Sequence, residues 1–184
     1  MQANGISRLM KTECYKNLIN FEINKTPLRM IALEYSDIAD STVMCLASSK
    51  LNNTIIYFSL KGCFNITDNG LIVFFQSQNF QLIKYMDLSE TKITDNLSVV
   101  LSRSKNSLNL KKLQLNSCEK ITSEFFLNII DSAHLVSIKY CSFENCNLEE
   151  INLANLSYEP HRILLIKHSR LPKKLYCLNL TENH

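Results

Sequence analysis

The sequence contains few of the residues that interrupt regular structure: three glycines, three prolines and no tryptophan among 184 residues. So few glycines and prolines argue against a disordered linker and against a β-sandwich, because tight turns depend on both residues. No apolar run reaches the length needed to span a membrane. With only three glycines, the chain also lacks a P-loop and a dinucleotide-binding fingerprint. We therefore expect a folded domain that neither crosses a membrane nor binds a nucleotide through these motifs.

An excess of one charge is also missing, since 20 Lys and Arg stand against 17 Asp and Glu. The resulting net charge of +3 is mixed along the chain and does not by itself indicate nucleic-acid binding. The first 18 residues lack the long apolar core of a secretory signal. The seven cysteines are odd in number and show no tight disulfide-framework spacing. We expect reduced thiols in an intracellular protein, cytoplasmic or nuclear, with a mitochondrial location as the alternative.

Groupings of residues that would support catalysis or metal binding are scarce. The four histidines are spread over the chain, and none accompanies a nucleophile in a recognisable arrangement. Cys141 and Cys146 lie near His134 and His161 in sequence, but no C-x-x-C pair is present to build a zinc site. We expect these cysteines to be packing residues. The sequence predicts no enzyme, no cofactor, no metal and no small-molecule substrate.

What the sequence does contain is an internal repeat. The pattern L-x-x-L-x-L, with any large apolar residue read as L, recurs with its last position at Leu33, Leu60, Leu88, Leu115 and Tyr140. The intervals of 27, 28, 27 and 25 residues fall in the range of leucine-rich repeats. The full triplets are Leu28-Ile31-Leu33, Ile55-Phe58-Leu60, Ile83-Met86-Leu88, Leu110-Leu113-Leu115 and Leu135-Ile138-Tyr140.

Two further features recur in phase with the triplet: a small residue three positions after it, and then an Ile-Thr-Asp motif or a close variant of it. Both are clearest in the stretch CFNITDNGL at residues 63–71. Asp68-Asn69-Gly70 alone would indicate a hairpin tip or a calcium loop. A helical apolar pattern follows it, however, and the corresponding positions of other units lack the acidic calcium ligands. We predict that Cys63 packs inside a bend, that Thr67 or Asp68 caps the next helix, and that Gly70 relieves crowding there.

These units resemble the cysteine-containing subtype of leucine-rich repeat, best known from F-box substrate receptors of ubiquitin ligases and from mitotic-exit antagonist proteins. The resemblance implies an α/β leucine-rich-repeat solenoid of about five to six repeats, with short parallel strands on a concave face and helices on the convex face. It covers residues 28–142. We expect residues 1–27 to form an N-terminal cap and residues 143–184 to form irregular C-terminal repeats and a cap.

The C-terminal part has more than one interpretation. We favour strands near 163–168 and 175–180, the second closing the open end, although Leu148-Ile151-Leu153 also fits the strand pattern. No F-box pattern is found, so adaptor recruitment is not implied by the resemblance. A basic stretch with Arg162, Lys167, Arg170, Lys173 and Lys174 would suit an acidic partner or RNA, and a solvated edge equally well.

The outward positions of the expected strands predict a binding surface. Tyr57 and Tyr85 fall at equivalent positions of adjacent strands and should stand side by side, with Lys112 and Lys139 continuing the row. Tyrosine combines a large apolar area with a polar tip and is enriched at binding hot spots. The candidate partner-binding residues are Tyr57, Ser59, Lys61, Tyr85, Asp87, Lys112, Gln114 and Lys139.

The predicted function is therefore a non-catalytic protein–protein interaction module or adaptor. The resemblance extends this to a substrate receptor or scaffold of the ubiquitin-ligase type. The alternative is a structural or assembly subunit of a large complex, either mitochondrial and similar to coupling factor B, or a ribonucleoprotein.

Overall fold

The computed structural model describes residues 29–48, 54–78, 80–148, 163–167 and 177–179. Within these ranges short strands alternate with helices along the chain. The strands are β1 (Met30–Ala32), β2 (Tyr57–Ser59), β3 (Tyr85–Asp87), β4 (Lys112–Gln114), β5 (Tyr140–Ser142), β6 (Ile163–Lys167) and β7 (Cys177–Asn179). The helices are α3 (Asp40–Ser48), α4 (Asp68–Gln76), α5 (Asn96–Arg103), α6 (Ser123–Ile130) and the 3₁₀ helix η2 (Lys105–Ser107).

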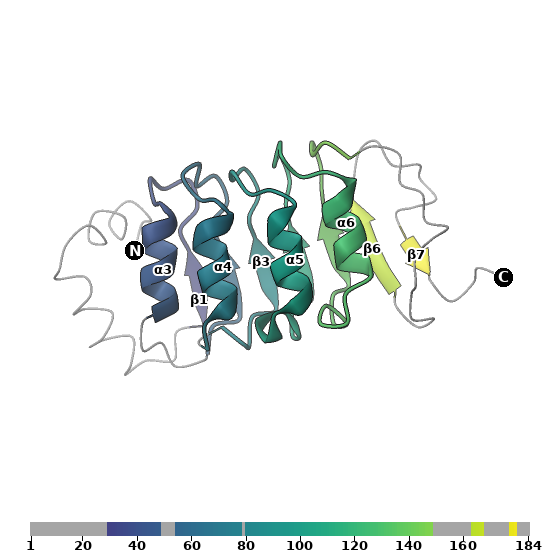
Figure 1. The fold of residues 1–184 in the computed structure, drawn as a ribbon, viewed down its shortest axis with the longest axis horizontal. Helices are drawn as coiled ribbons and strands as arrows, with labels where there is room; N and C mark the ends of the chain where they lie inside the picture. The colour runs from purple at the N-terminus through teal and green to yellow at the C-terminus, as the bar shows by residue number, and fades with distance from the viewer. Residues whose placement is uncertain (1–28, 49–53, 79, 149–162, 168–176, 180–184) are drawn as a thin grey trace.

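The strands form one sheet whose spatial order is the order of the sequence, β1 to β7. Strands β1 to β6 are parallel to their neighbours, and β7 runs antiparallel to β6. Helices α3, α4, α5 and α6 stand in a row on one side of this sheet (Figure 1). The described chain thus has two layers, with one face of the sheet covered by helices.

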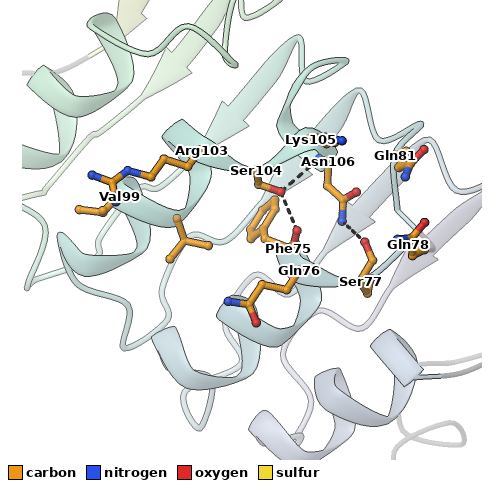
Figure 2. Close-up of a pocket in the computed structure, with 11 residues that line it drawn as sticks. Phe75, Gln76, Ser77, Gln78, Gln81, Val99, Arg103, Ser104, Lys105 and Asn106 are labelled. Atoms are coloured by element: carbon orange, nitrogen blue, oxygen red, sulfur yellow. Dashed lines mark hydrogen bonds between the residues drawn. The ribbon is translucent and has the colours of Figure 1, made fainter.

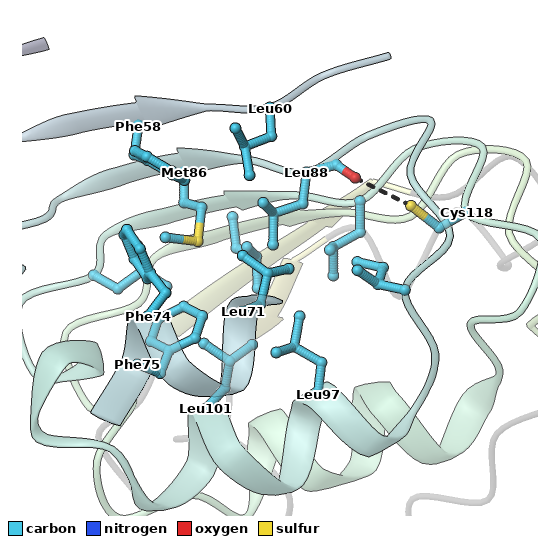
Figure 3. Packing of buried hydrophobic residues seen from close by; sticks show 14 of the residues in the cluster. Phe58, Leu60, Leu71, Phe74, Phe75, Met86, Leu88, Leu97, Leu101 and Cys118 are labelled. Carbon is cyan, nitrogen blue, oxygen red and sulfur yellow. Dashed lines mark hydrogen bonds between the residues drawn. The ribbon is translucent and has the colours of Figure 1, made fainter. Parts of the chain in front are cut away.

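The core fills the space between these layers (Figure 3). The inward residues of the strands, such as Phe58 and Met86, meet Leu71, Phe74 and Leu101 from the helices, and all five are at most 1% exposed. In α4 the apolar side chains follow the i, i+3, i+4 spacing of a one-sided helix. Burial of each large apolar side chain stabilises the fold by about 1.5–3 kcal/mol. Because these residues come from successive units, each unit is stabilised by its neighbours.

Strands β1 to β5 are each followed by a bend with the same backbone geometry. The residue two positions after the last apolar residue has a positive φ in all five units: Tyr35, Gly62, Glu90, Ser117 and Asn145 at 52°, 69°, 58°, 55° and 57°. In the first four units its N–H donates to a carbonyl of the next unit, as from Gly62 to Ser89 at 2.9 Å. A side chain at Gly62 would meet the Tyr35 ring, with its Cβ only 2.3 Å from Cδ1. The missing side chain at Gly62 therefore provides the space for Tyr35.

Buried cysteines link successive bends. Cys63 donates from Sγ to the Leu33 carbonyl at 2.9 Å, Cys118 to Leu88 at 3.3 Å, and Cys146 to Leu115 at 2.9 Å. Each thiol thus bonds to the end of the preceding strand. The prediction that Cys63 packs inside a bend is confirmed, since it is fully buried.

Threonines cap the helices, while aspartates join the units. Thr67 Oγ1 accepts the Asn69 N–H at 3.3 Å and caps α4. Asp68 does not cap this helix: its carboxylate accepts the N–H and hydroxyl of Thr94 in the next unit at 2.9 and 2.5 Å. The same pair of bonds runs from Thr67 to Asp40 and from Thr122 to Asp95. The Thr-Asp motif therefore bridges one unit to the next.

The register of the fifth unit differs from the expected one. Strand β5 pairs Cys141 with Leu113, so the in-phase triplet is Ile138-Cys141-Phe143 and not Leu135-Ile138-Tyr140. Cys141 and Phe143 are fully buried. The prediction was wrong here because Leu135 and Ile138 are both core residues, and their spacing mimics the start of a repeat. The corrected interval from Leu115 to Phe143 is 28 residues.

The last strands lie where apolar triplets indicated strands, at 163–167 and 177–179. The antiparallel direction of β7 ends the parallel series. The expected cap at 1–27 and most of the alternative strand Leu148-Ile151-Leu153 lie outside the described residues. The proposed limits of the caps stay predictions.

Candidate binding face of the sheet

The sheet face opposite the helices carries a row of tyrosines. Parallel pairing places Met30, Tyr57 and Tyr85 side by side on β1, β2 and β3. Adjacent strands are about 4.8 Å apart, so neighbouring rings in this row lie within contact range of a single bound side chain. Tyr85 is 41% exposed and Tyr57 is partly buried. The adjacency of Tyr57 and Tyr85 is as the repeat predicted.

The row continues through Lys112 and ends on a third tyrosine. Lys112 pairs with Tyr85 on one side and with Tyr140 on the other. Its Nζ lies 5.0 Å from the centroid of the Tyr140 ring, a cation–π distance. Lys139, expected at this place, instead precedes β5 and is exposed. Tyr140 was not among the predicted binding residues, because the expected register of the fifth unit assigned its side chain to the core.

Tyr57 is held by the first unit of the sheet. Its hydroxyl donates to Glu34 Oε1 at 3.5 Å, and the hydroxyl of Ser59 donates to the same oxygen at 2.7 Å. Burial raises the pKa of Tyr57, the hydrogen bond with Ser59 opposes this, and the charges of Glu34 and Asp87 add to the rise. Tyr57 therefore presents a neutral ring with a fixed hydroxyl at neutral pH.

Two of the candidate residues are buried in the sheet. Ser59 is fully buried, and Asp87 is 7% exposed. Asp87 Oδ1 accepts the backbone N–H of Ser89 at 2.9 Å. Gln114, next to Asp87 in the register, is partly buried. Ser59 and Asp87 thus form hydrogen bonds within the protein, while Gln114 keeps part of its side chain exposed.

Lys61 belongs to a small cluster at the end of the strands. Its Nζ is 3.7 Å from Glu90 Oε1 and 5.4 Å from the centroid of the Tyr35 ring. Tyr35 donates from its hydroxyl to the same Glu90 oxygen at 3.2 Å. The interaction with Tyr35 raises the pKa of Lys61, although burial slightly opposes it. Tyr35 is 58% exposed and was not among the predicted binding residues. The one sequence feature that could have indicated its position is Gly62, one repeat later, which leaves room for the Tyr35 ring.

A hollow of about 430 Å³ lies elsewhere, between α4, α5 and η2 (Figure 2). Ser104 donates to the Phe75 carbonyl at 2.6 Å and Asn106 to the Ser77 carbonyl at 2.8 Å. These polar groups join one unit to the next and give the hollow a structural role. Its lining residues are Phe75, Gln76, Ser77, Gln78, Gln81, Val99, Val100, Arg103, Ser104, Lys105 and Asn106.

No group of three or more His, Cys, Asp or Glu side chains converges as metal ligands in the part of the chain that the structure describes. Cys141 is buried in the core and Cys146 bonds to Leu115, and neither forms a disulfide. None of the described helices is long and apolar enough to cross a membrane. Of the basic C-terminal stretch, the structure describes only the backbone of Lys167, which pairs with Ser142.

Comparison with known proteins supports the repeat architecture. No protein-family model matches the sequence. Among solved structures, the chain is similar to the leucine-rich-repeat protein Rad7 in the crystal structure of the yeast Rad7 and Elc1 complex, with a TM-score of 0.60. The chain folds as a leucine-rich-repeat solenoid. The match has 19% sequence identity and covers 76% of this chain but only 33% of the Rad7 chain. At this identity, the likeness is one of fold alone.

Proposed function

We propose that this solenoid is a non-catalytic protein-interaction module that holds a partner on the open face of its sheet. The observation that carries the proposal is the row of Tyr57, Tyr85, Lys112 and Tyr140 on four neighbouring strands. Aromatic side chains of this kind supply large contact areas at little entropic cost and are enriched in binding hot spots. Gln114 and Lys61 add polar contacts beside the row.

The proposal extends to an adaptor or scaffold role. Cys63, Cys118 and Cys146 recur at one position, as in the cysteine-containing repeats of ubiquitin-ligase receptors that the sequence resembles. Rad7, the similar solved structure, was crystallised in a complex with Elc1.

Affinity purification followed by mass spectrometry tests the proposal. We expect the double variant Tyr57→Ala/Tyr85→Ala to recover its main partner at least tenfold less efficiently than the unmodified chain, with little change in thermal unfolding. The matched control is Phe64→Ala, which removes a 59% exposed aromatic ring from the loop between β2 and α4. Equal recovery by the double variant and the control would refute binding through the tyrosine row.

The identity of the recovered proteins separates the two functional classes. Ubiquitin-ligase components would support the adaptor, whereas respiratory or ribosomal proteins would support a subunit of a large assembly.

A further inference from the structure

A row of basic side chains lines the edge at which the strands begin. Arg29, Ile56, Lys84, Lys111 and Lys139 occupy the same position, one residue before successive strands. Each N–H from Ile56 to Lys139 donates to the carbonyl of the preceding member at 2.8–2.9 Å. Four of the five positions are therefore basic. We call Arg29, Lys84, Lys111 and Lys139 the basic edge.

The cations of the basic edge are available to a ligand. Arg29, Lys111 and Lys139 are exposed and Lys84 is partly buried. The structure pairs none of the four with a carboxylate among the residues that it describes. Lys84, Lys111 and Lys139 precede adjacent strands and repel one another, and an anionic chain laid along the row would relieve this repulsion.

Carboxylates gather at the opposite end of the same strands. Glu34, Glu90 and Glu144 lie in or beside the bends that follow β1, β3 and β5. Glu34 is bonded to Ser59, and Glu90 is bonded to Tyr35 and paired with Lys61. The open face is thus polarised along the strand direction, with the basic edge and the adjacent Lys112 at one end and the carboxylates at the other.

Apolar side chains flank the basic edge on both sides. Leu82, Leu108 and Val136, just before the lysines, are 43%, 40% and 57% exposed. Asn109 donates from Nδ2 to the Gln81 carbonyl at 2.8 Å and so fixes the first two of these loops beside each other. On the other side lie Tyr85 and Tyr140 of the tyrosine row. The basic edge and its flanks therefore offer aliphatic, cationic and aromatic contacts in parallel lines.

We propose that the basic edge binds an extended, acidic segment of a partner protein that also carries apolar side chains. This inference rests on the proposed function and names the chemistry of the partner. From Arg29 to Lys139 is four strand spacings, about 19 Å, which an extended chain covers in about six residues. Acidic side chains at every second position would face the row, while the others would meet the leucines and tyrosines.

The same features favour a peptide over a nucleic acid. A polyphosphate backbone gains most of its affinity from broad cationic surfaces that neutralise many phosphates. Here the cations lie along one edge of the sheet with Lys112 beside them, carboxylates lie at the far end of the strands, and aliphatic Leu108 and Val136 flank the edge on the side away from the tyrosines. Nucleic acid is therefore the competing outcome of the test.

Fluorescence anisotropy with defined probes tests the inference. The probes are a labelled ten-residue peptide of alternating Glu and Val, the same peptide with Gln for Glu, and labelled decauridylate. We expect the Glu peptide to bind at least tenfold more tightly than the Gln peptide, and the triple variant Lys84→Glu/Lys111→Glu/Lys139→Glu to weaken it at least tenfold. The matched control is Lys92→Glu/Lys105→Glu/Lys120→Glu, with the same change in charge at exposed sites off the row, and it should change binding less than twofold.

Circular dichroism of every variant checks folding. The milder triple variant, with Gln in place of Lys84, Lys111 and Lys139, should also weaken binding of the Glu peptide. Equal weakening by both charge reversals, or tighter binding of decauridylate than of the Glu peptide, would overturn the inference. Failure of the proposed function gives a different pattern. In that case the tyrosine variant captures its partner normally, while the basic-edge reversal still abolishes binding of the Glu peptide.

Discussion

At the scale of single residues, the buried thiols show how one small side chain serves two units. Cys146 satisfies the carbonyl of Leu115, which closes the preceding strand. An unpaired buried carbonyl would be costly, so the thiol stabilises the bend as well as filling it. Thr91 performs a related task within its own unit by donating to the Leu88 carbonyl at 2.7 Å. A hydroxyl or a thiol at this position thus supplies the donor that the bend requires.

Because of the Cys146 thiol, we expect the free energy of unfolding to fall as pH rises in the alkaline range. Burial raises the pKa of Cys146 to about 12, from 9.0. Between these values the unfolded chain releases the proton while the folded chain keeps it, so the free energy of unfolding falls as pH rises. This contribution is fully present below about pH 9 and decreases by up to about 1.4 kcal/mol per pH unit above it.

The variant Cys146→Ser isolates this effect, because a serine hydroxyl keeps a donor at this position, as Thr91 does toward the Leu88 carbonyl, but does not ionise in this range. In urea unfolding at pH 8, 9, 10 and 11, we expect its stability to fall less steeply than that of the unmodified chain, by about 1 kcal/mol between pH 9 and 10. Parallel pH profiles for the two proteins would show that Cys146 does not carry the dependence.

At the scale of secondary-structure elements, the close approach of α3 and α4 depends on Gly70. A Cβ at this position would lie 2.9 Å from Asp40 Cα and 2.7 Å from its Oδ1. Asp40 also holds the N–H and hydroxyl of Thr67, the cap of α4. The glycine of CFNITDNGL therefore lets two helices and one cap meet at a single point, which supports its predicted role.

Replacing Gly70 by alanine sets two effects against each other. Alanine favours a helix over glycine by about 1 kcal/mol, whereas overpacking against backbone costs about 1–3 kcal/mol. Because the clash involves the backbone of Asp40, we expect a net loss of about 1 kcal/mol in the free energy of unfolding. Urea titration measures it, with Asn69→Ala at an exposed site of the same helix as control. A more stable Gly70→Ala protein would contradict the observed proximity.

The positions and the register of the strands could be predicted wherever the apolar triplet of the repeat was recognised correctly. The recurring apolar triplet placed β1 to β4 and paired Tyr57 with Tyr85, because equal spacing from the triplet fixes register. The fifth unit failed because cysteine at position 141 is core-forming but was not read as an apolar repeat residue. Lys139 was misplaced in consequence.

The polar contacts of the face were beyond prediction for a different reason. Periodicity tells which side of a strand a residue occupies, but not whether a neighbour covers it. Ser59 points outward in sequence terms, yet Glu34 from the preceding unit bonds to it and it is fully buried. The reach of Tyr35 across Gly62 to Glu90 likewise involves three units at once. Such contacts depend on side-chain length and neighbours, which a repeat pattern does not specify.

At the scale of the whole molecule, contacts are mainly between adjacent units, so energetic coupling should be local. Phe58 and Phe74 have ring centroids 4.5 Å apart, whereas Phe126 lies in α6, two units further along. We expect the substitutions Phe58→Leu and Phe74→Leu to couple by about 0.5 kcal/mol or more in a double-mutant cycle. The pair Phe74→Leu and Phe126→Leu should add to within about 0.5 kcal/mol.

Urea unfolding of the single and double variants measures both cycles. Similar coupling energies in the two cycles would indicate that energetic coupling extends through the whole core, and would contradict coupling confined to neighbouring units.

The carboxylates of Asp40, Asp68 and Asp95 each reach one unit forward, and none depends on a residue further away. Any unit whose motif contains both Thr and Asp can therefore bond through its Thr to the Asp of the unit before it, and through its Asp to the Thr of the unit after it. If one whole repeat were duplicated or deleted in the gene, each Asp would still face a Thr. A change of any other length would leave a carboxylate facing the wrong residue, so the solenoid is expected to lengthen and shorten in steps of one repeat.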